Sequence, residues 1–129
     1  MKIFVADDSS AIRERIVQLV SEVHNAEVVG QASDGSETLR AIPQSHPDLV
    51  ILDLKMPGAG GFEILPLIKG LSSPPLVMVL TNYATSMHRA ACKNLGADYF
   101  FDKSKEFENA IAVIESLAEQ DLMTRESGH

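Results

Sequence analysis

Cysteine and long apolar runs are both scarce in this sequence. Cys92 is the only cysteine, which excludes an internal disulfide and any CxxC metal or redox motif. The longest apolar runs have five residues, such as 76–80, whereas a membrane helix needs roughly 20. The N-terminal segment reaches Asp7 and Asp8 too soon for a secretory signal. We therefore expect a cytoplasmic protein that makes no membrane contact.

Cations are also few. Eleven Lys and Arg residues stand against 18 Asp and Glu residues, which gives a net charge of −7. No cluster of cations is visible, and nucleic-acid binding needs one because phosphates must be neutralised. The four histidines are scattered, which argues against a zinc site. A hydrophobic fraction of 45% over 129 residues is typical of one folded domain.

Short apolar segments that read as β-strands recur along the chain. They cover residues 2–6, 27–32, 48–53, 76–81 and 98–101. Three of them, centred on residues 3–5, 49–52 and 76–80, are apolar on both faces. Strands buried on both faces belong to parallel sheets that are covered by helices.

Segments with apolar residues at helical spacing separate these strands. We expect a first helix after an N-cap at Ser10 and a second over 36–42, which Pro43 stops. A third helix is expected over 62–71 despite Pro66, and a fourth over 85–95, which ends at Gly96. A fifth helix is expected to begin near Phe107. The last residues are polar, so we expect one domain over 1–120 and a fraying tail over 121–129.

The alternation predicts an α/β fold. Five strand–helix units with right-handed crossovers give a doubly wound, flavodoxin-like parallel sheet, for which we expect the strand order 2-1-3-4-5. In such sheets a ligand site lies beyond the carboxyl ends of the strands, where the strand order reverses. For this order the reversal falls between the first and third strands.

Polar residues follow the strands at this point. Asp7 and Asp8 end the first strand, Asp53 ends the third, Thr81 ends the fourth, and Lys103 lies just beyond the fifth. Two carboxylates about 4 Å apart repel by about 1 kcal/mol even in water, so protonation, a metal cation or the Lys103 ammonium must offset the repulsion. Mg²⁺ favours oxygen ligands and also binds phosphate oxygens. The residues thus predict a Mg²⁺-assisted phosphoryl site.

The whole chain resembles the receiver domains of two-component response regulators of the chemotaxis type. The matching segments are residues 2–8 (KIFVADD), residues 49–58 (LVILDLKMPG) with Gly61, the Leu80-Thr81 pair, and residues 96–103 (GADYFFDK). Together these segments are far more specific than any one of them.

The resemblance implies roles for the acidic residues. Asp53 is the expected phosphoacceptor, which takes a phosphoryl group from a phosphohistidine of a sensor histidine kinase or a histidine phosphotransfer protein. Asp8, Asp53 and the backbone carbonyl of Lys55 are the expected Mg²⁺ ligands, and Asp7 acts through a metal-bound water.

The resemblance also implies a switch. Thr81 and Lys103 are expected to contact phosphoryl oxygens, and Phe100 occupies the aromatic switch position that turns inward with Thr81. The expected output is a changed surface on the fourth helix, fifth strand and fifth helix, which binds a downstream protein. The chain would then catalyse only its own phosphorylation and dephosphorylation.

Three positions depart from the family pattern. Ser104 replaces the usual Pro after Lys103, and because a cis bond before a non-proline residue costs about 2.5–4 kcal/mol, we expect a trans bond and an altered loop. Asn82 stands after Thr81, where the family usually has a small residue, and Tyr83 follows it. With Lys55, both are expected to crowd the path of a hydrolytic water. Phe100 carries no hydroxyl, so a partner that relies on a tyrosine at this position would bind differently.

Other functions remain open. The chain could act as a phosphorelay intermediate or phosphate sink, or it could be a receiver excised from a helix-turn-helix transcriptional regulator. A phosphatase of the haloacid-dehalogenase type is disfavoured, because it needs a second Asp two residues after the nucleophile, where this chain has Lys55. A flavin carrier is excluded, because its phosphate would lie after the first strand, where Asp7 and Asp8 would repel it.

Overall fold

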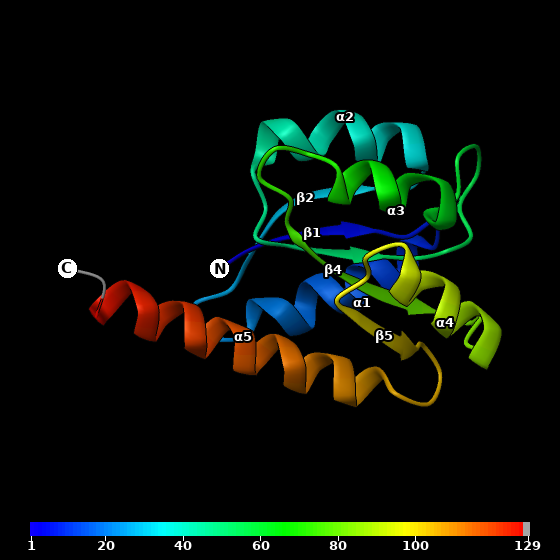
Figure 1. The fold of residues 1–129 in the computed structure, drawn as a ribbon. Coiled ribbons are helices and arrows are strands. Elements are labelled where there is room, and N and C mark those ends of the chain that lie inside the picture. The colour runs from blue at the N-terminus through cyan, green and yellow to red at the C-terminus, as the bar shows by residue number, and fades with distance from the viewer. Residues whose placement is uncertain (128–129) are drawn as a thin grey trace.

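A computed structural model describes residues 1–127 of the chain and contains a five-stranded parallel sheet (Figure 1). The order is β2-β1-β3-β4-β5, as predicted. The strands are β1 (Lys2–Ala6), β2 (Glu27–Ala32), β3 (Leu49–Leu52), β4 (Leu76–Thr81) and β5 (Tyr99–Asp102). Their bounds agree with the predicted ones to within a residue.

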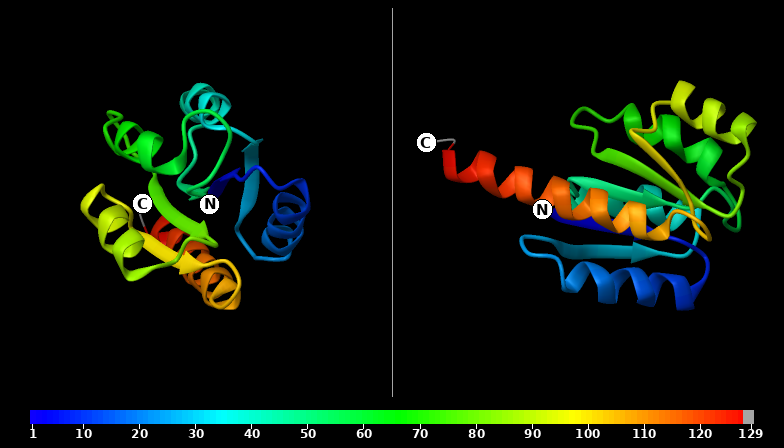
Figure 2. Two further views of the ribbon diagram at one scale, coloured as in Figure 1. Left: turned by 90° about the vertical axis from the view of Figure 1, so that its right-hand side faces the viewer. Right: turned by 90° about the horizontal axis from the view of Figure 1, so that it is seen from below.

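Five helices cover the two faces of the sheet (Figure 2). They are α1 (Ser10–Ser21), α2 (Gly35–Ser45), α3 (Gly61–Lys69), α4 (Ser86–Asn94) and α5 (Phe107–Ser127). Buried residues of α2, α3 and α4 form one core cluster with the sheet, and buried residues of α1 and α5 form the other. The expected doubly wound fold is confirmed.

Strand β1 shows why the central strands are apolar throughout. Phe4 belongs to the cluster under α2, α3 and α4, whereas Ile3 and Val5 belong to the cluster under α1 and α5. All three side chains are completely buried. Successive side chains of a strand point to opposite faces, so a sheet covered on both faces needs apolar residues at every position.

The end of α4 at Gly96 matches its sequence signal, whereas the starts of α1 and α4 each differ from the predicted ones by a residue. The cap of α1 is Ser9 rather than Ser10, and its hydroxyl accepts a hydrogen bond from the Ile12 amide at 3.3 Å. Thr85 caps α4 through its side chain. Gly96 follows the end of α4 with a φ of +103°, a left-handed conformation that favours glycine, so its predicted role is confirmed.

Pro43 and Pro66 both lie inside helices. The prediction that Pro43 stops the second helix was wrong, because α2 continues to Ser45 and the His46 amide still donates to the Ile42 carbonyl at 3.0 Å. Pro66 lies in the middle of α3. A proline removes one helical hydrogen bond, and burial of each helix's apolar face offsets that loss.

The expected fraying tail is part of helix α5 as far as Ser127, and residues 128–129 lie outside the described residues. Tertiary contacts hold this extension. The Asn25 side-chain amide donates to the Ala118 carbonyl at 2.9 Å and to Asp121 at 3.0 Å, and the N-terminal ammonium lies 3.3 Å from Asp121. Over residues 1–127, none of the helices has the length and apolar character needed to cross a membrane.

Candidate functional site

Three carboxylates converge at the carboxyl edge of the sheet, as predicted. Asp7 and Asp8 follow β1 and Asp53 follows β3, and one oxygen from each lies within 4.8 Å of the others. Asp7 and Asp53 are only 2% and 5% exposed, whereas Asp8 is exposed. The Asp53 amide donates to the Ala6 carbonyl at 2.9 Å, so strand pairing itself brings the two segments together.

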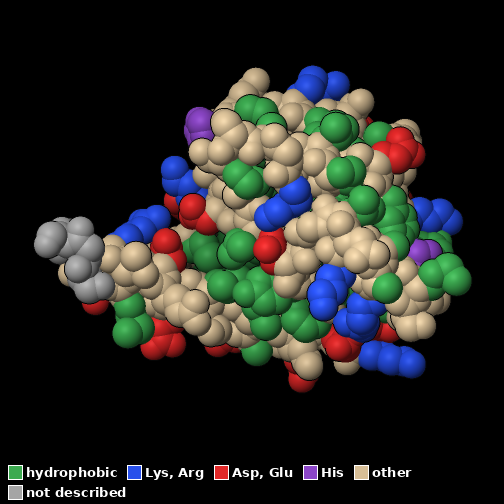
Figure 3. Space-filling model, viewed as in Figure 1, with side chains coloured by type: hydrophobic (Ala, Val, Ile, Leu, Met, Phe, Trp, Pro, Cys, Tyr) green, Lys and Arg blue, Asp and Glu red, His purple; other side chains and the backbone are tan. Residues whose placement is uncertain are grey.

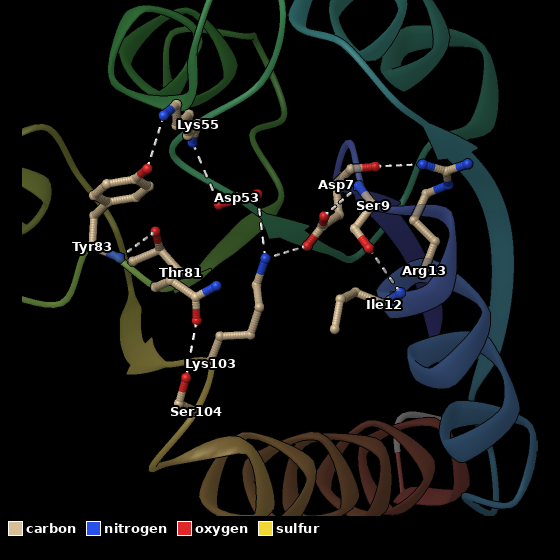
Figure 4. Close-up of polar contacts among 11 residues, drawn as sticks. Asp7, Ser9, Ile12, Arg13, Asp53, Lys55, Thr81, Tyr83, Lys103 and Ser104 are labelled. Carbon is tan, nitrogen blue, oxygen red and sulfur yellow. Dashed lines mark hydrogen bonds and ion pairs between the residues drawn. The ribbon is translucent and has the colours of Figure 1, made fainter.

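Lys103 lies between two of these carboxylates (Figure 4). Its ammonium is 2.6 Å from an oxygen of Asp7 and 3.3 Å from an oxygen of Asp53. Only 8% of its side chain is exposed, so the Lys103 ammonium lies in the buried part of the site. The backbone explains its depth, because the Lys103 amide donates to the Thr81 carbonyl at 2.8 Å and extends the pairing of β4 with β5.

Burial and charge shift the pKa values in this cluster. Burial raises the pKa of Asp53, and the charge of Asp7 adds to this effect, while Lys103 opposes it. Burial alone would lower the pKa of Lys103, but its hydrogen bond to Asp7 and the charges of Asp53 and Asp7 outweigh that and raise it. Lys103 therefore stays an ammonium, and it compensates the carboxylates only in part.

Asp7 is held by its neighbours at the start of α1. Its Oδ1 accepts a hydrogen bond from the Ser9 amide at 2.9 Å, and its Oδ2 accepts from Lys103. The Arg13 guanidinium donates to the Asp7 backbone carbonyl at 2.6 Å. Sequence reasoning missed this role of Arg13, because a charged residue on an amphipathic helix normally faces solvent.

Thr81 is completely buried at the end of β4, beside the Asp53 segment. Its hydroxyl oxygen accepts a hydrogen bond from the Tyr83 amide at 3.1 Å. The Tyr83 hydroxyl in turn accepts one from the Lys55 ammonium at 2.9 Å, and the Lys55 amide donates to Asp53 at 3.4 Å. A chain of contacts thus links the loops after β3 and β4 (Figure 4).

The unusual residues Asn82 and Ser104 contact each other. The Ser104 hydroxyl donates to the Asn82 side-chain oxygen at 3.1 Å and links the loops after β4 and β5. The Lys103–Ser104 peptide bond is trans, as expected. The amides of Ser104 and Lys105 both donate to one oxygen of Asp102, at 2.8 and 3.1 Å, which shapes the loop before α5.

Phe100 lies in β5, which β4 separates from β3, the strand that Asp53 follows. Its half-buried ring packs against the core cluster under α4. The Arg89 guanidinium lies 4.8 Å from the ring centroid and donates to the Phe100 backbone carbonyl at 2.9 Å. Arg89 also pairs with Glu106 at 2.9 Å. Arg89 and Glu106 thus connect α4, β5 and the start of α5, a connection that the sequence did not indicate.

The acidic cluster could hold a metal ion. Asp7, Asp8 and Asp53 supply oxygens, which are the ligands that hard divalent cations prefer. Three carboxylates with one ammonium leave a net charge of about −2 when all are ionised, and a divalent cation would neutralise it.

Sequence comparisons agree with this geometry. The family model described as "Response regulator receiver domain" matches residues 3–115. The chain is 31% identical over 127 residues to the nitrate/nitrite response regulator NarL of Escherichia coli, covering 97% of this chain and 58% of that protein. It is 32% identical over 120 residues to a protein-glutamate methylesterase/protein-glutamine glutaminase of Koribacter versatilis, covering 93% of this chain and 33% of that protein. The chain thus spans a third to three-fifths of the length of these two relatives.

Solved structures show the same fold over nearly the whole chain. The N-terminal domain of an uncharacterized protein from Wolinella succinogenes aligns with a TM-score of 0.83 and 28% identity, covering 96% of this chain and 98% of that one. A two-component response regulator of the LuxR family from Aurantimonas sp. SI85-9A1 aligns with a TM-score of 0.84 and 26% identity, covering 92% and 85%. The chain belongs to the response regulator receiver domain family.

Proposed function

We propose that this receiver domain accepts a phosphoryl group on Asp53 and thereby switches a protein-binding surface. The donor is a phosphohistidine of a sensor histidine kinase or of a histidine phosphotransfer protein. One observation carries the proposal: a buried carboxylate, Asp53, lies against the Lys103 ammonium and beside two further carboxylates. In the reaction a carboxylate oxygen of Asp53 forms a bond to phosphorus, the N–P bond breaks, and the histidine nitrogen keeps the bonding electrons.

The residues around Asp53 position the transferring group and stabilise its charge. Lys103 contacts both Asp7 and Asp53, and it would turn from the Asp53 oxygen to a phosphoryl oxygen. The Thr81 hydroxyl uses its oxygen to accept from the Tyr83 amide, which leaves its proton for a second phosphoryl oxygen. Phosphoryl transfer depends mainly on such positioning and charge stabilisation.

We propose Mg²⁺ as the cation of the acidic cluster. Asp8, Asp53 and the Lys55 backbone carbonyl would hold it directly, and Asp7 would act through a water. Support for the indirect role of Asp7 comes from its two oxygens, which accept from the Ser9 amide at 2.9 Å and from Lys103 at 2.6 Å. The corresponding contacts of Asp53 are longer, at 3.4 and 3.3 Å, and leave its oxygens more available to a cation. When bound, the ion would supply charge neutralisation for the transferring phosphoryl group.

The proposed output surface consists of α4, β5 and α5. Movement of Thr81 toward the phosphoryl group would free space for the Phe100 ring. An inward turn of that ring would remove the face on which Arg89 lies, 4.8 Å from the centroid. Arg89 would then change its contacts with Glu106 and with any downstream protein bound there.

We further propose that the chain catalyses no reaction beyond its own phosphorylation and dephosphorylation. Its place would be the cytoplasm, where ATP-dependent kinases supply phosphohistidine donors. Its partners would be proteins rather than nucleic acid or membrane, in keeping with a net charge of −7.

The test is phosphorylation by a small acyl-phosphate donor in the presence of Mg²⁺, followed by intact-mass measurement. The wild-type chain should gain one phosphoryl group, and Asp53→Asn should gain none because an amide is a poor nucleophile. Glu14→Gln, a change at an exposed acid on α1, is the matched control and should behave as wild type. A mass shift that persists in Asp53→Asn would assign the acceptor to another residue.

A further inference from the structure

A groove between α1 and α5 takes no part in the proposed phosphoryl chemistry. Its volume is about 590 Å³. Leu19 lines it from α1, Val23 from the segment that follows α1, and Ile111 and Leu122 from α5. All four side chains are partly exposed rather than fully buried. The groove therefore offers apolar surface that a ligand could cover.

The unequal lengths of the two helices open this groove. Both helices run back from the carboxyl edge of the sheet, but α1 has 12 residues and α5 has 21. At 1.5 Å per residue, α5 extends about 13 Å farther. Figures 1 and 2 show its C-terminal turns projecting past the sheet. The groove lies toward this end, so an occupant would leave Asp53 accessible.

The rim of the groove is acidic. Glu22, Glu115 and Glu119 line it and are exposed. Among the residues that the structure describes, no Lys or Arg lines the groove, and His24 is the only basic side chain there. Figure 3 shows acidic and hydrophobic side chains next to each other along the projecting part of α5.

Arg15 of α1 and Arg125 of α5 have partners outside the groove. Arg125 lies 3.2 Å from Asp121, one turn earlier on α5. Arg15 places its guanidinium over the Phe107 ring, 4.2 Å from the centroid, near the other end of α5. The carboxylates of the rim are therefore available to an incoming cation.

We propose that this groove binds a basic amphipathic helix of a partner protein. Such a helix would cover the apolar floor with residues at i, i+3, i+4 and i+7 spacing and would place Lys or Arg against the acidic rim. A second copy of this chain fits less well, because a symmetric interface would bring Glu115 and Glu119 of two chains together, and each chain carries a net charge of −7.

The probe for this proposal is a fluorescein-labelled synthetic 18-residue peptide, with leucine on one helical face and lysine on the other. Fluorescence anisotropy measures its binding to the full chain at low salt. Glu115→Gln with Glu119→Gln should weaken binding about fivefold, since each exposed ion pair contributes modestly. Leu122→Ser should weaken it about tenfold through lost apolar contact. Glu14→Gln with Glu63→Gln removes the same charge elsewhere and should change binding less than twofold.

A charge swap makes the test sharper. Glu115→Lys with Glu119→Lys should lose the Leu/Lys peptide and gain a Leu/Glu peptide of the same pattern. Equal weakening by the Glu14 and Glu63 control, or equal binding of a Leu/Lys peptide shuffled to have no apolar face, would overturn the proposal. A wild-type dimer in sedimentation that Leu122→Ser dissociates would instead assign the groove to a second copy.

Discussion

The interior of the central strands and the residues that follow them differ in what their side chains do for stability. Leu52 is completely buried among apolar side chains. Asp53, the next residue, is almost equally buried but carries a charge beside the like charge of Asp7. Burial of a side chain thus changes from stabilising at Leu52 to costly at Asp53, at the carboxyl edge of the sheet.

The difference shows how the fold accommodates its site. Lys103 lies close to both Asp7 and Asp53 and lowers the pKa of Asp53 more than Asp7 raises it, so the raised pKa of Asp53 reflects chiefly the cost of its burial. The apolar strands supply the stability that keeps these groups in place. We therefore expect substitutions on the two sides of this boundary to have effects of opposite sign.

The largest effect should come from the strand interior. Leu52→Ala leaves a cavity in a fully packed sheet, and we expect it to lower the free energy of unfolding by about 3 kcal/mol. Leu67→Ala is the matched control, because that side chain is 56% exposed on α3 and should cost less than about 0.5 kcal/mol. Urea unfolding measures both, and equal costs would contradict the packing argument.

A divalent cation should stabilise the fold by binding at the carboxylates that follow the strands. Because three carboxylates repel one another, Mg²⁺ at 100 times its Kd should add about 2.7 kcal/mol to stability, which corresponds to a rise of about 10 °C in Tm for a domain of this size. Calorimetry with and without Mg²⁺ checks this, and Asp8→Ala should abolish the rise. An unchanged wild-type melting curve would count against the metal site.

The apolar strands and the carboxylates that follow them could largely be predicted from the sequence. Runs such as residues 49–52 are apolar at every position, so a two-sided core was readable, and the strand order followed from general rules for parallel sheets. That order alone brought Asp7, Asp8 and Asp53 together. These features depend on local pattern and topology, which the sequence expresses directly.

Features that depend on tertiary contacts were less predictable. Pro43 was expected to end its helix, but packing of the helix on the sheet carries it further. The depth of Lys103 follows from backbone pairing beyond β5 and not from its residue type. The contacts of Tyr83 with Lys55 and of Asn82 with Ser104 join side chains from three different loops, and no spacing in the sequence relates these residues.

A smaller effect of the boundary concerns pH. The pKa of Asp53 is raised above its ordinary value of 3.8, so the folded chain binds more protons than the unfolded chain above that pH, and this contribution to stability is lost as pH rises through the folded pKa. In metal-free buffer, Asp53→Asn should therefore gain little over wild type near pH 4. Near pH 7 it should be more stable than wild type, because the buried carboxyl of Asp53 is then ionised and its charge is costly to bury.

Urea unfolding at several pH values measures this difference. Glu14→Gln serves as the control, because Glu14 is an exposed acid, and its difference from wild type should stay flat over the same range. A constant gain for Asp53→Asn between pH 4 and pH 7 would show that the charge of Asp53 is not the source of the cost.

The smallest effect should be on the lifetime of the acyl phosphate on Asp53. Hydrolysis needs a water in line with the Asp53–phosphorus bond, and three side chains are expected to crowd that approach. Lys55 and Tyr83 contact each other at 2.9 Å, and Asn82 is held by Ser104. None of the three provides a carboxylate base. Asn82→Ala with Tyr83→Ala should therefore speed dephosphorylation about three- to tenfold, which is about 0.7–1.4 kcal/mol in barrier.

The decay of phosphorylated protein, followed by intact mass after the donor is removed, measures this rate. Met87→Ala changes a side chain of α4 that is 79% exposed and should decay at the wild-type rate. A change of less than about twofold in the double variant, or ~0.4 kcal/mol, would mean that water reaches the phosphorus by another path. The Lys55–Tyr83 contact would then link two loops of the site without shielding it.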